Sequence, residues 1–205
     1  GISLKTAWSL MQENNVVTIP CVTEEGVLEG VITIGDITKS YMNLYDSSII
    51  SKANTKYSNI LDTLEGSIVV GDAEAYFDKG KVLIAAANPD LMENYIEKHD
   101  LVILGNRYES QLCAIEMEAG CIIVCEGAGV SLTIRKLAQE RGCTVITTPY
   151  DTYTTARLIN QSMPISYFMT MENIIGFSDE DPIDDIRDIM ANKRHRDFPI
   201  LDSDG

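Results

Sequence analysis

One pattern occurs twice in this sequence, and its two copies align without a gap. Residues 3–26 read SLKTAWSLMQENNVVTIPCVTEEG, and residues 182–205 read PIDDIRDIMANKRHRDFPILDSDG. Identical residues stand at several matched positions: Met11 and Met190, Pro20 and Pro199, Gly26 and Gly205. A repeat of this length predicts two copies of one small α/β unit, neither of which can bury a full apolar face alone.

Each copy has the pattern of a helix followed by a strand. In the first copy Ser3 is a candidate helix cap, and we expect one buried stripe at helical spacing: Leu4, Ala7, Trp8 and Met11. Strands are predicted at 16–22 and 27–32, and a further helix opens at Asp36. The second copy predicts a front strand at 174–177, a helix that ends near Lys193 and a strand at 198–201.

Between the copies the chain alternates strands and helices. Apolar runs predict strands at 67–70, 82–86, 101–104, 121–124 and 144–146. Helical patterns lie at 89–98, 109–119, 132–141 and 152–161, with Gly120 and Gly142 as expected helix stops. Short connections between such elements predict a mainly parallel sheet covered by helices. Residues 43–57 are polar and poorly periodic, so we expect a linker there.

Composition narrows the classes of partner. The chain carries 16 basic and 31 acidic side chains, and the resulting charge of −15 disfavours nucleic acid and anionic membranes as partners. No apolar run approaches the roughly 20 residues of a membrane span. Five cysteines without a CxxC pair predict reduced thiols in a cytoplasmic protein. Both ends fall inside expected structural units, so we expect a piece of a longer polypeptide.

The sequence contains no recognisable catalytic centre. His99 and His195 are far apart, and no nucleophile-elbow, metalloprotease or P-loop motif occurs. The glycine-rich segment EGAGVS at 126–131 lies between an expected strand and an expected helix. It lacks the third glycine of a dinucleotide-binding fingerprint, so a tight turn capped by Ser131 competes here with a dinucleotide cofactor site.

The segment GVITIGDI, residues 30–37, has the pattern of a nucleotide site. A strand ends at Ile32, Thr33 supplies a hydroxyl, and Asp36 follows at the start of a helix. The hydroxyl and the helix N-terminal amides can bind phosphate oxygens, and an ionised Asp36 can accept hydrogen bonds from both ribose hydroxyls. The alternative is that Asp36 only caps the helix.

This combination of motifs resembles a known family. A tandem of helix–strand–strand–helix units with G-x-x-T/S-x-x-D after the second strand is similar to a pair of CBS domains, the Bateman module that binds adenine nucleotides. The middle segment, with Gly105-Asn106-Arg107 and the later run TTPYDTYTTARLI, resembles a DRTGG domain. It departs from the name motif, since Asn106 stands in place of Asp and no Thr-Gly-Gly follows. A DRTGG domain between two CBS domains is typical of the regulatory region in CBS-containing, manganese-dependent (family II) inorganic pyrophosphatases.

The resemblance implies a fold, a domain layout and a set of binding residues. The fold is α/β: a CBS pair at 1–45 and 163–205, interrupted by a DRTGG-like domain with a mainly parallel sheet at 58–162. The T-x-x-D element of CBS domains holds ribose and phosphate, which implies Thr33 and Asp36. Adenine lies against the residues before the strand proline and against the front strand. These positions are held by Val17, Thr18, Ile19, Thr170, Asn173, Ile175, Arg196, Asp197 and Phe198.

The basic run Lys193-Arg194-His195-Arg196 is the densest in the chain. It either complements the dipole at a helix C-terminus or binds nucleotide phosphates in a cleft between the copies, and both can hold at once. Arg194 and His195 therefore join the candidate binding residues. Phe198 or the guanidinium of Arg196 can stack on a purine.

The chain is therefore predicted to be a regulatory module without catalytic residues, cofactor or metal of its own. The resemblance implies inhibition by AMP and ADP, and activation by ATP or a diadenosine polyphosphate. It also implies attached DHH and DHHA2 catalytic domains that hold manganese and hydrolyse pyrophosphate. A homodimer is expected, because an unpaired CBS module leaves apolar helix faces exposed. The alternative is a structural dimerisation module that binds no ligand.

Overall fold

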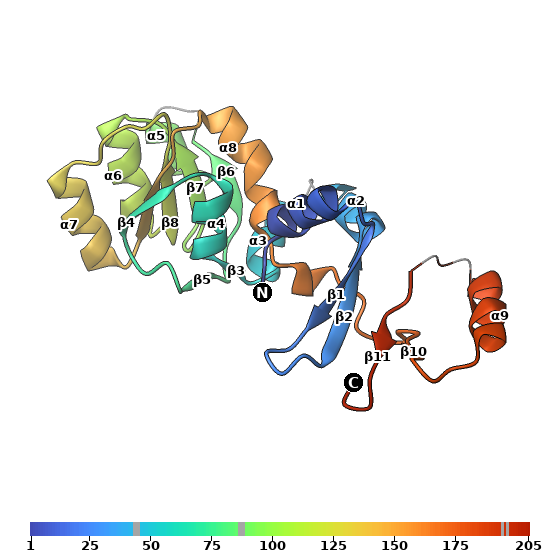
Figure 1. Cartoon of the computed structure of the whole chain (residues 1–205). Coiled ribbons are helices and arrows are strands. Elements are labelled where there is room, and N and C mark those ends of the chain that lie inside the picture. Colours follow the sequence, from blue (N-terminus) through green and yellow to red (C-terminus); the bar gives the residue numbers. More distant parts are fainter. Residues whose placement is uncertain (43–45, 86–88, 194, 196) are drawn as a thin grey trace. The chain divides into compact units, whose positions relative to one another are not determined.

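The computed structural model describes residues 1–42, 46–85, 89–193, 195 and 197–205 (Figure 1). The chain divides into two compact units: residues 1–6 with 40–167, and residues 7–39 with 168–205. We call the first the central unit and the second the paired unit. Almost all of both copies of the repeat belongs to the paired unit.

A five-stranded sheet forms the core of the central unit. Its strands have the order β4-β9-β8-β7-β6, with these bounds: β4 Ser67–Val70, β6 Val82–Ile84, β7 Leu101–Leu104, β8 Cys121–Val124 and β9 Thr144–Thr147. The strands β6 to β9 are parallel, and β4 pairs antiparallel with β9 at one edge. The prediction of an α/β fold with a mainly parallel sheet is confirmed.

The central strands of this sheet are buried on both faces. Every residue of β7 and β8 is buried, which explains why their sequences LVIL and CIIV are continuous apolar runs. On one face Val102 and Ile122 pack in a single apolar cluster with residues of α6 (Tyr108–Glu116) and α7 (Leu132–Arg141). Their neighbours along each strand, such as Ile103 and Ile123, point to the opposite face and are equally buried.

Shorter elements complete the central unit. They are α3 (Ile49–Lys52), β3 (Thr55–Lys56), α4 (Tyr57–Thr63), β5 (Tyr76–Phe77), α5 (Pro89–Met92), α8 (Thr152–Leu158) and the 3-10 helices Ile159–Ser162 and Ile165–Tyr167. The expected linker at 43–57 is wrong from residue 46 onward; residues 43–45 lie outside the described residues. Ile49, Ile50 and Tyr57 are buried, so this segment is part of the core.

Two predicted helix ends in the central unit are also wrong. α5 stops at Met92 instead of residue 98. After it the N–H groups of Asn94 and Tyr95 bond three residues back, to Leu91 and Met92, and the N–H of Glu97 donates to the buried carboxylate of Asp100 at 2.8 Å. α6 ends at Glu116, and Gly120 is not its stop. A Cβ at Gly120 would lie 2.8 Å from the carbonyl oxygen of His99, so close backbone packing requires this glycine. Gly142, with φ of 67°, caps α7 as predicted.

The paired unit contains one β-hairpin and one parallel strand pair. Its elements are α1 (Leu4–Asn14, whose first residues belong to the central unit), β1 (Thr18–Val22), β2 (Leu28–Thr33), α2 (Ile34–Met42), β10 (Phe177–Ser178), α9 (Ile183–Lys193) and β11 (Ile200–Leu201). β1 and β2 are antiparallel, and β10 and β11 are parallel. The repeat is visible in the backbone, since α1 and α9 cover aligned residues and the aligned Gly26 and Gly205 have φ of 88° and 85°.

Backbone hydrogen bonds join β2 to the second copy and to the segment that precedes it in the chain. Val31 and Thr170 exchange two N–H···O=C bonds of 2.9 Å, and the N–H of Leu28 donates to the carbonyl of Gly205 at 3.0 Å. The second copy therefore flanks the strand of the first copy that leads into Thr33.

The apolar faces of the repeat helices are less buried than the sequence predicted. Leu4, Ala7 and Met11 are buried, but Trp8 is 41% exposed, so the predicted four-residue stripe is wrong at this position. In α9, which is described over its whole length, no residue is buried, and Ile183 is 71% exposed. None of the described helices is long and apolar enough to cross a membrane.

Candidate functional site

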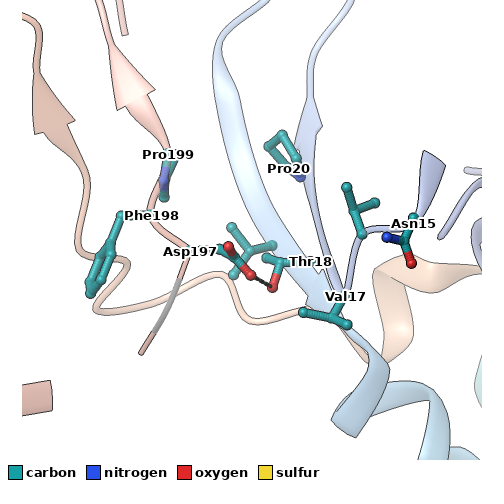
Figure 2. Close-up of a pocket in the computed structure, with 9 residues that line it drawn as sticks. Asn15, Val17, Thr18, Pro20, Asp197, Phe198 and Pro199 are labelled. Atoms are coloured by element: carbon teal, nitrogen blue, oxygen red, sulfur yellow. Dashed lines mark hydrogen bonds between the residues drawn. The ribbon is translucent and has the colours of Figure 1, made fainter. Parts of the chain in front are cut away.

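The paired unit contains a cleft between residues of its two copies. The cleft consists of two adjoining cavities of about 320 and 380 Å³, whose shared lining is Val17, Thr18, Val31, Asp197, Phe198 and Pro199. The first cavity (Figure 2) continues to Asn15, Val16 and Pro20. The second continues to Thr33, Ile34, Thr170, Asn173, Ile174, Ile175 and His195. Cavities of roughly 300–1,000 Å³ are the usual size of small-molecule sites.

The strand connections bring these residues together. On the side of the first copy, Thr18 pairs with Thr33 across the β1–β2 hairpin, and the N–H of Ile34 donates to the carbonyl of Val17 at 2.9 Å. On the side of the second copy, the bond from the Phe177 N–H to the Pro199 carbonyl, 3.0 Å long, places the start of β11 beside β10. The start of α2 and the segment before β11 therefore both face the cleft.

Equivalent residues of the repeat meet inside the cleft. Thr18 and Asp197 are 179 residues apart, which is the offset of the repeat, and the Thr18 hydroxyl donates to Oδ2 of Asp197 at 3.4 Å. Figure 2 shows the Asp197 carboxylate pointing toward Thr18, whereas the Phe198 ring points to the other side of their segment. Such self-contact of aligned positions is typical of two units related by a local twofold axis.

Thr33 and Asp36 form a reciprocal cap at the start of α2. Oδ2 of Asp36 accepts hydrogen bonds from the backbone N–H and the hydroxyl of Thr33, at 2.9 and 2.8 Å. The backbone N–H of Asp36 donates in return to the Thr33 hydroxyl at 3.2 Å. This is the capping-box arrangement. Both bonds to the carboxylate use Oδ2, so Oδ1 is not committed to the cap.

Aromatic side chains stand at the second-copy side of the cleft. The Phe198 ring lies 5.0 Å from the Phe177 ring at a tilt of 50°, and 6.0 Å from the His195 ring, edge to face. Asn173, which lines the second cavity, has a left-handed backbone with φ of 55°, a conformation that asparagine tolerates better than most residues. The cleft thus combines apolar surface with a small set of polar groups.

The structure gathers most of the sequence-predicted binding residues in this cleft. Its lining includes Val17, Thr18, Thr33, Thr170, Asn173, Ile175, His195, Asp197 and Phe198. Ile19 and Asp36 do not line it; Ile19 neighbours Thr18 on β1, and successive strand residues point to opposite faces. Arg194 and Arg196 lie outside the described residues, and so does the proposed stacking by the Arg196 guanidinium.

Sequence reasoning missed several lining residues: Asn15, Val16, Pro20, Val31, Ile34, Ile174 and Pro199. Two of them carried a usable signal. Val31 is two residues before Thr33 on the same strand, so the two side chains share a face. Pro199 aligns with Pro20 in the repeat, and both line the first cavity.

The glycine-rich segment after β8 forms a tight turn. Glu126 and Gly127 are both left-handed, with φ of 62° and 64°, and their N–H groups donate to the carbonyls of Tyr150 and Thr148. The Ser131 hydroxyl caps α7 by accepting from the N–H of Ile134 at 3.3 Å. The first amides of this turn are therefore bonded within the chain and are not free for a pyrophosphate, which favours the turn interpretation.

The cysteines are free thiols, and burial makes most of them poor nucleophiles. Cys113, Cys121, Cys125 and Cys143 are buried, and Cys21 is half-buried. Desolvation raises the pKa of Cys143 to about 12 and raises the pKa of Cys121 well above its ordinary value. Within the described ranges, no group of three or more His, Cys, Asp or Glu side chains could hold a metal ion.

Comparisons with protein-family models match two domains. The model described as "CBS domain" matches residues 1–43, and the model described as "DRTGG domain" matches residues 59–162. The second match covers half of the chain.

Comparisons with individual proteins agree with these domain matches. The chain is 36% identical over 201 residues to the cobalt-dependent inorganic pyrophosphatase of Clostridium perfringens, covering 98% of this chain and 37% of that protein. It is 24% identical to the probable manganese-dependent inorganic pyrophosphatase of Thermotoga maritima, covering 96% of this chain and 35% of that protein. The chain thus spans little more than a third of each of these relatives.

A solved structure is similar to nearly the whole chain. It contains the CBS and DRTGG domains of the regulatory region of the Clostridium perfringens pyrophosphatase, complexed with an activator, diadenosine tetraphosphate. The TM-score is 0.93 and the identity is 36%, and the match covers 99% of this chain and 88% of the other.

Proposed function

Because the chain belongs to the family of regulatory regions built from CBS and DRTGG domains, we propose that it binds an adenine nucleotide in the cleft of the paired unit. We further propose that this nucleotide controls pyrophosphate hydrolysis by attached DHH and DHHA2 catalytic domains, which would hold the manganese or cobalt named for the relatives. The resemblance to CBS and DRTGG domains predicted from the sequence is confirmed.

The observation that carries the proposal is the composition of the cleft wall. Residues predicted from the first copy, such as Thr18 and Thr33, and from the second, such as Asn173 and Phe198, line one continuous space. The solved relative was crystallised with diadenosine tetraphosphate, which supports an adenine nucleotide as the class of ligand. The predicted extents of 1–45, 58–162 and 163–205 remain our proposal for the domain layout.

The two cavities share six lining residues and differ in the rest of their walls. Beside the shared residues, the first cavity adds Asn15, Val16 and Pro20, and its valine and proline side chains suit the faces of a purine. The second cavity adds the hydroxyl, amide and imidazole groups of Thr33, Thr170, Asn173 and His195. We place the base in the first cavity and the ribose phosphate in the second, near the N-terminus of α2, whose dipole favours an anion.

Regulation requires that the nucleotide binds two arrangements of the molecule with different affinity. A ligand shifts such an equilibrium only by the ratio of its affinities for the two states. Following the family resemblance, we propose that AMP and ADP favour the inhibited state, and that ATP or a diadenosine polyphosphate favours the active state. The chain itself contributes binding and no catalytic group. The five free thiols and the acidic net charge support a cytoplasmic protein that does not bind nucleic acid.

Calorimetric titration of the chain with AMP, ADP, ATP and diadenosine tetraphosphate tests the binding proposal. Saturable heat with at least one of these ligands is expected, and the absence of heat at millimolar concentration of all four would leave a structural module as the better interpretation. The same titration with NAD examines the turn at 126–131, where no binding is expected. The regulatory proposal is tested by pyrophosphate hydrolysis in the longer polypeptide, measured with and without each nucleotide.

A further inference from the structure

Among the described residues that line the cleft, Asp197 provides the one carboxylate. An ionised carboxylate only accepts hydrogen bonds, and it repels phosphate groups. The part of a nucleotide that approaches Asp197 must therefore be a neutral group with an N–H or O–H donor. The base and the ribose carry such donors, whereas the phosphates do not.

The present partner of Asp197 leaves the carboxylate able to accept a stronger hydrogen bond. Its contact with the Thr18 hydroxyl is 3.4 Å long, whereas O–H···O hydrogen bonds are usually about 2.7–2.8 Å. Asp197 also belongs to the lining shared by both cavities, so its carboxylate borders the space assigned above to the base as well as the second cavity, in which we place the phosphate beside the start of α2. Figure 2 shows it pointing toward Thr18 across this space.

We propose that Asp197 selects adenine by accepting a hydrogen bond from the 6-amino group of the purine. This inference rests on the proposed function, since it assigns a role within the same cleft. The ribose hydroxyls are the other neutral donors of the nucleotide, and we place them in the second cavity beside Thr33. Adenine presents an amino donor at position 6, whereas guanine and hypoxanthine present a carbonyl oxygen, which is an acceptor. A carboxylate facing that oxygen has no donor to pair with and is repelled.

The repeat explains why the selection depends on the second copy. At the aligned position the first copy has Thr18, whose hydroxyl can donate or accept and therefore does not discriminate between the two bases. The second copy has the acceptor-only Asp197 instead. The two aligned positions meet in the cleft, so the carboxylate gives this near-symmetric space one preferred orientation for the base.

The test compares AMP with inosine monophosphate, which carries hypoxanthine, by calorimetric titration of the chain. The unmodified chain is expected to bind AMP roughly 10- to 100-fold more tightly, the value of one hydrogen bond to a charged group. In Asp197→Asn the amide can accept from an amino group or donate to a carbonyl, so the two affinities should come within about threefold of each other. Asp188→Asn removes the same charge from an exposed position of α9 and should leave the preference unchanged.

Three results would overturn the inference. The first is that the unmodified chain binds AMP and inosine monophosphate equally well. The second is that Asp197→Asn keeps the preference for AMP. The third is that Asp197→Asn remains folded by circular dichroism but loses affinity for both nucleotides by the same factor. In each case, AMP binding by the unmodified chain would leave the proposed function intact. Failure of the unmodified chain to bind any adenine nucleotide would overturn both proposals together.

Discussion

At the start of α2, the Asp36 carboxylate accepts hydrogen bonds from the backbone and side chain of Thr33. The capping interpretation of this residue therefore agrees with this structure. Asp36 does not line the cleft in this structure, but its Oδ1 takes no part in the cap, so a ribose contact through Oδ1 would leave the cap intact. Substitutions that keep or remove the cap can separate them.

Asp36→Ala is expected to lower both stability and affinity. Loss of the cap should cost about 0.5–2 kcal/mol in urea unfolding, and loss of a charged acceptor should weaken AMP binding by about 1.5–3 kcal/mol in calorimetry. Asp36→Asn retains an oxygen that accepts from Thr33, so its stability should change less while AMP binding still weakens. If Asp36→Asn binds AMP as tightly as the unmodified chain, Asp36 is a cap and no ligand contact.

Single residues of the cleft were predictable where a motif fixed their chemistry. Thr33 was found because a hydroxyl after a strand and before a helix is typical of a phosphate-binding turn. Ile34 and Ile174 were missed, because sequence shows which residue types occur but not which side of a turn each occupies. The left-handed backbone of Asn173 likewise carries no unambiguous sequence signal.

Among the elements, the buried strands were the easiest to predict. β7 and β8 are apolar at every position because both faces are covered, and a short continuous apolar run predicts such a strand. α3 was missed because its apolar pair, Ile49 and Ile50, is too short to show a period. α5 was predicted too long, because the chain after Met92 continues in turns whose hydrogen bonds its local pattern does not reveal.

Gly120, directly before β8, lies close to the backbone of His99, directly before Asp100 and β7, and this contact can be tested with a matched pair of glycine substitutions. Gly120→Ala would place a Cβ 2.8 Å from the carbonyl oxygen of His99, which should destabilise the chain by about 1–3 kcal/mol in urea unfolding. Gly105→Ala, after β7, meets no atom within 4 Å and should be close to neutral. Equal effects of the two substitutions would show that close packing is not the reason for Gly120.

The segment before α3 should contribute to acid sensitivity. A hydrogen bond from Lys52, at 2.7 Å, and further bonds from Ser48 lower the pKa of Asp46 from 3.8 to about 2. A lowered pKa in the folded state stabilises the fold at pH above about 4, and this contribution is lost as the pH falls toward 2. Asp46→Asn should therefore lose less thermal stability than the unmodified chain between pH 4 and pH 2. If the melting temperatures of the two proteins fall by the same amount between pH 4 and pH 2, the assignment is contradicted.

At the scale of the whole molecule, the repeat leaves apolar helix surface for a partner. Trp8 on α1 and Ile183 on α9 are 41% and 71% exposed, and we expect a second copy of the chain to cover them. Sedimentation should give the mass of a dimer for the unmodified chain. Trp8→Glu and Ile183→Glu should lower the measured mass toward that of a monomer. Glu13→Lys, which changes an exposed charge on α1, should leave the mass unchanged. A monomeric unmodified chain would contradict this prediction.

The position of the cleft in the paired unit predicts which backbone amides a bound nucleotide will protect from hydrogen exchange. Hydrogen exchange with and without saturating AMP should show slower exchange at residues 17–18, 31–34, 170–175 and 197–199, because these segments line the cleft. The strands β7 and β8 contribute no residue to it, and their exchange should not change. The dinucleotide alternative predicts the reverse, namely NAD-dependent protection at 126–131. Protection by AMP confined to the central unit would move the binding site there and contradict the assignment of the cleft to the aligned residues of the repeat.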